Sequence, residues 1–405
     1  MKKNGLNISV AAFAIVAVIS SVSFAAPKFA PYYNLQLTEG ISLPSRGDLI
    51  FDLNLVNDLG VLARINPEHS VLGFYQIKYT GPGIKRQEGE QFTDRTMDHM
   101  FVFRHTWTTP WDMKIKSQFD YWKEFRRSGT NELWGTGLYD MNRVGGLVGA
   151  EKVLGEFKVG AALQYHSMLF PNYTDLVAEI RSTGDDVTSS EGKQDHALVQ
   201  VGATAEWNKV KAVLDLTLQN YFKQKTITNV AQADGTFYSG ALQQDSITSI
   251  RAGRDFQYGV AGISPEIKWS GRTSNQNYLH FDSVTSTTPA ANGFFGNYYS
   301  NSQISIALPV IVRITKKWDT FLSWEQEIKS YSDRPARDED GNFLTDKQSN
   351  VSQYVSLGFN NHPNDVTTLT YYYVTQNSSS NMKYEKYFPY NFSAASFGIR
   401  FSYQY

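Results

Sequence analysis

The last nine residues of the chain, Phe397 to Tyr405, read FGIRFSYQY and alternate between two kinds of side chain. Large apolar or aromatic residues occupy every second position. The positions between them are small or polar: Gly398, Arg400, Ser402 and Gln404. Successive side chains of a β-strand point to opposite faces. The stretch therefore predicts a strand with one apolar face and one polar face.

The same alternation recurs along the chain, and helical spacing does not recur over a comparable length. Clear examples are the segments 113–120, 157–166, 199–207, 214–219 and 304–313. The connections between such segments alternate in length. Short connections are predicted at 66–70, 108–112, 154–156, 208–209, 270–274, 316–317 and 361–365. Long ones are predicted near 82–97, 126–138, 170–194, 224–253, 287–296, 332–350 and 377–391. Short turns at one end and long loops at the other are typical of outer-membrane barrels.

The N-terminus indicates export. Lys2 and Lys3 precede the short apolar run 11–19, and the small residues Ser23 and Ala25 offer a cleavage site after Ala25. Residues 1–25 are therefore predicted to be a cleaved signal peptide. The chain contains no cysteine, which excludes disulfides and thiol catalysis. Its net charge is −1, and loss of the two lysines makes the mature chain −3, which argues against a nucleic-acid partner.

An exported chain of alternating strands with one apolar face predicts a closed all-β barrel. In lipid every backbone polar group needs a partner within the protein, and an open sheet edge has none. We expect residues 26–405 to form one closed antiparallel up-and-down transmembrane β-barrel. Residues 26–46 are the natural first strand, giving 16 strands. If they instead form an N-terminal plug or tail, the count is 14. A soluble all-β protein is the remaining alternative.

The leader, the series of hairpins and the terminal strand resemble Gram-negative outer-membrane β-barrel proteins in general, including porins. Phe401, Tyr403 and Tyr405 resemble the C-terminal assembly signal of that class, which more often ends in Phe. The resemblance implies a location in the cell outer membrane and insertion by the barrel-assembly machinery. It also implies contact with outer-membrane lipid and lipopolysaccharide.

Tryptophans sort toward the predicted short turns. Aromatic side chains of barrels gather at the two membrane interfaces. We therefore predict that one periplasmic girdle contains Trp107, Trp111, Trp207, Trp269 and Trp318.

The polar faces of the strands predict a water-filled lumen with charges of both signs. Candidate lumen-lining residues are Arg104, Lys114, Lys116, Asp120, Arg313, Glu325, Glu327, Lys329 and Arg400. A basic wall at Lys114 and Lys116 facing an acidic wall at Glu325 and Glu327 would create a transverse field. The sequence leaves open whether these strands face each other.

The sequence favours a porin-like channel for passive diffusion of small hydrophilic solutes. A substrate-specific or hydrophobic-compound transporter or export channel is the first alternative, and a surface enzyme or adhesin on a barrel scaffold is the second. His280 and Asp282 are better explained as a polar lumen pair than as a protease pair. The acidic loop around Asp338 and Asp340 lacks the spacing of a calcium loop. We expect no catalytic residues, metal site or cofactor, and the oligomeric state stays open.

Overall fold

The computed structural model describes residues 27–46, 49–82, 95–127, 133–173, 192–233, 235–283, 286, 288–386 and 388–405. The predicted signal peptide lies outside these residues. No helix in the described part of the chain is long and apolar enough to cross a membrane.

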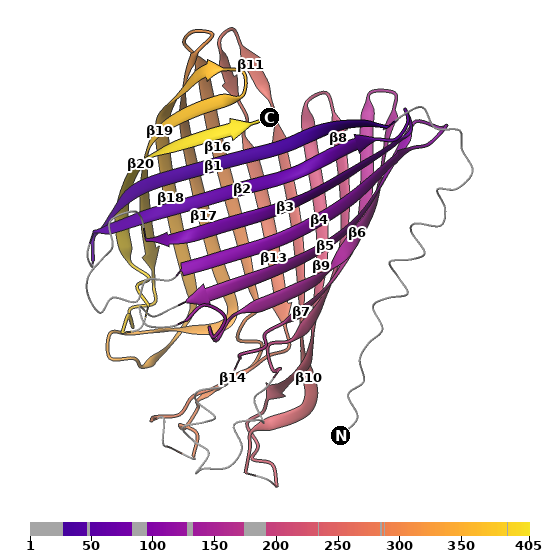
Figure 1. The fold of residues 1–405 in the computed structure, drawn as a ribbon. Coiled ribbons are helices and arrows are strands. Elements are labelled where there is room, and N and C mark those ends of the chain that lie inside the picture. The colour runs from indigo at the N-terminus through magenta and orange to yellow at the C-terminus, as the bar shows by residue number, and fades with distance from the viewer. Residues whose placement is uncertain are drawn as a thin grey trace.

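Most of the described chain folds into one large antiparallel sheet that closes on itself (Figure 1). Strands of the barrel wall that follow one another in the sequence are neighbours in this sheet, and β1 pairs with both β2 and β20. The strands are β1 (Lys28–Pro44), β2 (Ile50–Arg64), β3 (His69–Pro82), β4 (Arg95–Thr108), β5 (Met113–Arg127), β6 (Met141–Leu154), β7 (Phe157–Leu169), β8 (His196–Trp207), β9 (Val210–Ile227), β10 (Tyr238–Arg254), β11 (Phe256–Tyr258), β12 (Ala261–Ile263), β13 (Glu266–Ser274), β14 (Tyr278–Leu279), β15 (Phe294–Phe295), β16 (Asn301–Arg313), β17 (Trp318–Arg337), β18 (Phe343–Asn364), β19 (Thr367–Ser380) and β20 (Phe392–Gln404).

The barrel wall has 16 strands. The short strand β11 continues β10, and β12 continues into β13, so each pair counts once. β14 and β15 form a separate two-stranded sheet. The prediction of a 16-stranded antiparallel barrel is confirmed, and residues 28–44 form a wall strand rather than a plug or tail. Closure leaves no open edge in the ladder, as a membrane-spanning sheet requires.

Short turns gather at one end of the barrel, which we call the turn end; the opposite end is the loop end. Asn208 and Lys209 connect β8 to β9 with φ of 44° and 65°. Positive φ at both central residues is the type I′ geometry, which matches the twist of a hairpin.

The sequence misplaced one turn. Residues 270–274 belong to β13, and the turn lies at 259–260, between β11 and β12. The predicted long connection 224–253 was also too long, because β9 reaches Ile227 and β10 begins at Tyr238.

The apolar side chains face outward. Phe101, Phe119, Leu163 and Val201 are each about half exposed, and they alternate with less exposed or polar neighbours. Only a few apolar side chains in the described residues are buried, whereas many polar ones are. A soluble fold would have the opposite distribution. The exposed apolar band is therefore the surface that lies against lipid.

Candidate functional site: the inner wall of the barrel

The nine predicted lumen-lining residues all occupy strand positions of the face opposite the exposed apolar side chains. In β5, Lys114, Lys116 and Asp120 alternate with the half-exposed Phe119. In β17, Glu325 alternates with the half-exposed Leu322. The same alternation places the remaining members on this inner face: Arg104 in β4, Arg313 in β16, Glu327 and Lys329 in β17, and Arg400 in β20.

Asp120 organises a polar network on the inner face of β5, β6 and β7. Its side chain is only 2% exposed. One carboxylate oxygen accepts hydrogen bonds from His166 Nε2 at 2.9 Å and from Arg143 at 3.1 Å. The other accepts from Gln118 Nε2 at 3.1 Å. A buried carboxylate needs such partners. The sequence predicted Asp120 but not its partners, because three strands contribute them and their registers are not visible in the pattern.

The lysines of β5 have local partners. Lys116 Nζ lies 2.5 Å from Glu151 of β6, and Lys158 of β7 lies 3.6 Å from the same carboxylate. Arg104 donates two hydrogen bonds to Gln118 Oε1, at 2.9 and 2.6 Å. The charges of this wall are therefore partly neutralised within it.

The two walls of the hypothetical field are on opposite sides of the barrel. In the order of the 16 wall strands, β17 is eight strands from β5 in either direction. Glu325 and Glu327 form no ion pair with another described residue. Lys114 and Lys116 lie closer to the turn end of their strand than the glutamates do in theirs. The arrangement can thus produce an oblique field rather than a strictly transverse one.

A hollow in the inner wall lies along β17, β18, β19, β20, β1 and β2. It has a volume of about 480 Å³. Arg400 supplies its one charge, Tyr372 and Phe321 supply aromatic surface, and the rest of its lining is aliphatic, amide or hydroxyl: Gln36, Thr38, Asn54, Val56, Ser356, Thr370 and Val374. This part of the wall can contact an uncharged solute through hydroxyl and amide groups.

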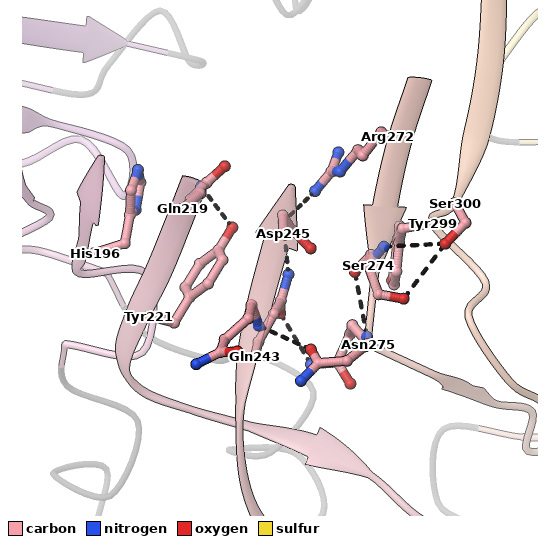
Figure 2. Close-up of polar contacts among 12 residues, drawn as sticks. His196, Gln219, Tyr221, Gln243, Asp245, Arg272, Ser274, Asn275, Tyr299 and Ser300 are labelled. Atoms are coloured by element: carbon pink, nitrogen blue, oxygen red, sulfur yellow. Dashed lines mark hydrogen bonds and ion pairs between the residues drawn. The ribbon is translucent and has the colours of Figure 1, made fainter. Parts of the chain in front are cut away.

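A second polar cluster lies at the loop end of β8, β9, β10 and β13, and Figure 2 shows it. Arg272 donates to Asp245 at 2.6 Å, and the Asp245 side chain is fully buried. Gln243 donates to the same oxygen at 3.2 Å. Ser274 N donates to Ser300 Oγ at 3.0 Å, which fastens the β13–β16 connection to the wall.

The sequence missed this second cluster because it placed 224–253 in a loop and 270–274 in a turn. The outer face of β10 carries Ser246 and Thr248, so its alternation is weak.

Contacts between arginines and aromatic rings connect the loops at the loop end of the barrel. The Arg337 guanidinium lies 4.0 Å from the centre of the Phe343 ring, and that of Arg334 lies 5.0 Å from the Tyr298 ring. Burial raises the pKa of Tyr298 to about 12, so its hydroxyl stays protonated. His280 packs edge-on against Phe343 at 5.1 Å. It lies in this loop cluster, directly after β14, and not on a strand of the barrel wall.

The acidic loop is a turn. Asp338 accepts hydrogen bonds from the backbone N–H and the side chain of Asn342, at 2.8 and 2.9 Å. Gly341 has φ of 92°, which suits glycine. These bonds lower the pKa of Asp338. In the described residues no group of three or more His, Asp or Glu side chains could hold a metal ion.

Four of the five predicted girdle tryptophans lie beside turns. Trp107 is the penultimate residue of β4, Trp207 ends β8, Trp318 begins β17, and Trp111 lies in the β4–β5 turn. The placement of Trp269 is wrong, because it lies inside β13 and pairs with Ile250 and Ile304.

The residues of the predicted assembly signal lie at the barrel seam. Phe401 pairs with Leu37 of β1 and Leu369 of β19. Tyr403 pairs with Leu35, and the backbones of Tyr405 and Tyr33 exchange hydrogen bonds of 2.8 and 2.9 Å.

A closed antiparallel barrel of this size, with an apolar exterior and a charged interior, has the architecture of bacterial outer-membrane proteins. The chain is therefore a barrel protein of the cell outer membrane. No known protein-family description matches the sequence, and no curated protein does.

Three solved structures with a similar fold are distant in sequence from this chain. OmpT, an outer membrane protein of Vibrio cholerae, is 11% identical, with 95% of this chain and 100% of that chain covered and a TM-score of 0.47. The anion-selective porin from Comamonas acidovorans is 10% identical, with 94% and 100% covered and a TM-score of 0.46. CdiB from Acinetobacter baumannii is 7% identical, with 94% and 66% covered and a TM-score of 0.46.

Proposed function

We propose that the protein is a porin-like channel through which small hydrophilic solutes diffuse passively. One observation carries the proposal: charged side chains of the inner face are exposed to solvent. Lys158, Arg251 and Glu266 expose 52%, 49% and 43% of their side chains, and all three lie on the face opposite the apolar band. A barrel of 16 strands is too wide for side chains alone to fill. Exposed charges on its inner wall support a water-filled lumen.

The proposal includes no catalytic role. His166 and Asp120 form an acid–base pair, but Arg143 and Gln118 also bind that carboxylate, and the imidazole is buried. Such a pair serves to satisfy buried polar groups. We propose that the network stabilises the wall.

The test is conductance in a planar bilayer. Folded full-length protein should give stepwise single-channel currents that rise in proportion to salt concentration, as a water-filled pore does. Folding is checked first by heat-modifiable mobility on a gel. Folded protein that never conducts would refute the channel.

A selective channel is the second candidate, and the hollow around Tyr372 and Arg400 favours it. Its lining of amides, hydroxyls and two aromatic rings suits a polar uncharged solute such as a sugar. Addition of a sugar should then produce current noise that Tyr372→Ala removes. A sugar series without any effect on the noise would leave only non-selective diffusion.

A further inference from the structure

Two aromatic rings lie along one row of the inner wall, within the hollow that contains Arg400. The row crosses five strands in register and consists of Phe321 in β17, Gly358 in β18, Tyr372 in β19, Gly398 in β20 and Gly40 in β1. Three of these five positions are glycines, so each ring has room to lie over a neighbouring strand.

Distances at the glycines show where the rings lie. A Cβ on Gly398 would be 2.7 Å from Tyr372 Cζ, and a Cβ on Gly40 would be 2.9 Å from the Tyr372 hydroxyl oxygen. The Phe321 ring covers Gly358 in the same way, at 2.6 Å. Both rings line the hollow, so each lies against the wall and presents surface to the lumen. Their strands are two apart in the sheet, which separates the rings by about 10 Å.

Polar side chains beside the two rings are available to a ligand. Gln36, Asn54 and Ser356 line the hollow, and their side chains form no hydrogen bond with another residue that the structure describes. Elsewhere on the inner wall such a group is occupied, as Gln118 is by Arg104. The hollow therefore offers amide and hydroxyl groups to a ligand that carries several hydroxyl groups.

Arg400 gives the hollow a positive charge that has no acidic partner. Its Nε donates to Thr38 Oγ1 at 3.3 Å, and no carboxylate of a described residue lies within 4 Å of its guanidinium. By contrast, Arg143 binds the Asp120 carboxylate at 3.1 Å. The terminal nitrogens of Arg400 remain available, and a guanidinium binds a carboxylate through two parallel hydrogen bonds.

The surrounding acidic residues favour one orientation of a negatively charged ligand. None of the described residues that line the hollow is acidic. Along their strands, Asp52 of β2 and Glu325 of β17 lie closer to the loop end than the row of Arg400 does. Asp319 belongs to that row, three strands away, and His362 binds it at 2.7 Å. A negative group is therefore favoured at the turn-end side of the hollow, and the uncharged part of the ligand beside the rings.

We propose that this hollow binds a sugar acid, a pyranose that carries a carboxylate, in preference to the uncharged sugar. The proposal rests on the selective channel proposed above and names its substrate class. The carboxylate binds the Arg400 guanidinium, the hydroxyl groups bind the available amides and hydroxyls, and the apolar face of the ring packs on Tyr372 or Phe321. The volume of about 480 Å³ lies within the range of small-molecule sites, about 300–1,000 Å³.

The test measures binding of glucuronate, glucose and acetate to the folded full-length protein in neutral detergent by isothermal titration calorimetry. Calorimetry detects binding whether or not the protein conducts, so failure of this proposal is distinguishable from failure of the channel. Arg400→Gln removes the charge, and Phe321→Leu removes one ring. The control is Arg64→Gln, which changes an exposed arginine at the turn end of β2, outside the hollow. Heat-modifiable mobility on a gel verifies that each variant folds.

Wild-type protein should bind glucuronate more tightly than glucose or acetate. Arg400→Gln should weaken glucuronate binding roughly 10-fold, because charge-assisted hydrogen bonds are lost, and should leave glucose binding unchanged. Phe321→Leu should weaken binding of both sugars by the same factor. The Arg64→Gln control should bind as wild type does.

Four results would overturn the proposal, and two of them need no variant. Glucuronate that binds no more tightly than glucose would exclude a role for the carboxylate. Acetate that binds as tightly as glucuronate would indicate a simple anion site. Equal losses of glucuronate affinity in Arg400→Gln and Arg64→Gln would assign the effect to the general charge of the lumen. Folded protein that binds neither sugar would exclude the site altogether, whatever its conductance.

Discussion

At the scale of single residues, the barrel depends on buried polar groups rather than on an apolar core. Asp58, Asp120 and Asp245 are each at most 5% exposed, and each accepts hydrogen bonds from side chains of neighbouring strands. These bonds tie strands together on the inner face, where side chains interact less through apolar packing. Buried carboxylates that accept several hydrogen bonds thus stabilise this wall locally.

Asp120→Asn tests that view. The substitution removes the charge that His166 and Arg143 bind. Arg143 then loses its ionic partner although only 22% of its side chain is exposed to solvent. We expect a loss of about 1–3 kcal/mol in the free energy of unfolding, the penalty for a partly buried group that loses its partner. Urea-induced unfolding of protein refolded into lipid vesicles measures it.

The matched control for Asp120→Asn is Glu266→Gln. It breaks an ion pair of 4.0 Å with Arg251 in which both side chains are nearly half exposed. Exposed pairs contribute about 0–1 kcal/mol. If the two variants lower the free energy of unfolding equally, burial does not explain the contribution of the Asp120 network to stability.

Glu385 predicts a pH-dependent loop. Burial by itself would raise its pKa, but hydrogen bonds from Asn391, Arg46 and the backbone N–H groups of Asn391 and Tyr390 lower it to about 2. A carboxylate with a depressed pKa stabilises the fold above its unfolded value of 4.5 and stops doing so as pH falls toward 2. Amides of residues 380–386 and 388–391 should therefore exchange hydrogen faster as pH drops through that window, after correction for intrinsic rates.

Glu385→Gln should remove this pH dependence, because the amide does not titrate. Glu339→Gln, a change at an exposed residue of another loop, is the control and should leave it intact. If hydrogen exchange depends on pH in the same way in the wild type and in Glu385→Gln, Glu385 is not the group that causes the pH dependence.

At the scale of elements, glycines allow large inner-face rings to lie flat on the wall. A Cβ on Gly358 of β18 would lie 2.2 Å from the Tyr371 carbonyl oxygen and 2.6 Å from the Phe321 ring. Phe321, on neighbouring β17, thus occupies the space that a side chain at Gly358 would need. The hollow beside Arg400 includes this ring, so the glycine shapes the lumen as well as the sheet.

Gly358→Ala should destabilise the barrel by about 1–3 kcal/mol, since overpacking forces the ring or the strand to move. Gly240→Ala in β10 is the control, because a Cβ there meets nothing within 4 Å. Urea unfolding in vesicles again gives the comparison. Equal stability of the two variants would mean that Phe321 moves away without penalty.

The strand pattern of the sequence predicted the architecture well and the strand ends less well. Alternation is visible wherever one face is apolar, as in Phe397–Tyr405, so the existence of most strands was predictable. It fails in β10, where Ser246 and Thr248 take outer-face positions. It also fails where strands continue past the membrane: β17 and β18 have 20 and 22 residues, more than a bilayer requires. In these extensions the amino-acid composition is typical of loops, although the chain is in a strand.

The partners across strands were not predictable at all. Asp120 and His166 are 46 residues apart, and their contact depends on two registers that a one-residue slip would reverse. The girdle residue Trp269 was misplaced for a related reason. A stretch rich in Ser and Gly, 270–274, was interpreted as a turn, yet the sheet continues through it.

At the scale of the whole molecule, closure determines which charges face each other. Strands β5 and β17 are far apart in the sequence and occupy opposite walls because β1 pairs with β20. Lys116 is neutralised by Glu151 within its own wall, whereas Glu325 and Glu327 have no ionic partner among the described residues. If the lumen conducts, the acidic wall should therefore dominate, and the channel should prefer cations weakly.

Glu325→Gln with Glu327→Gln should then lower the cation-to-anion permeability ratio on the order of twofold. A unit charge in water at about 8 Å contributes roughly 0.5 kcal/mol, which sets that scale. The ratio comes from reversal potentials across a salt gradient at low ionic strength, where screening is weak. Lys114→Gln with Lys116→Gln should shift it the opposite way. The control, Glu339→Gln with Asp340→Asn, removes two carboxylates from an exposed loop and should have little effect. An equal shift in the control would mean that charges of the loops at the loop end, and not those of the acidic wall, determine the selectivity.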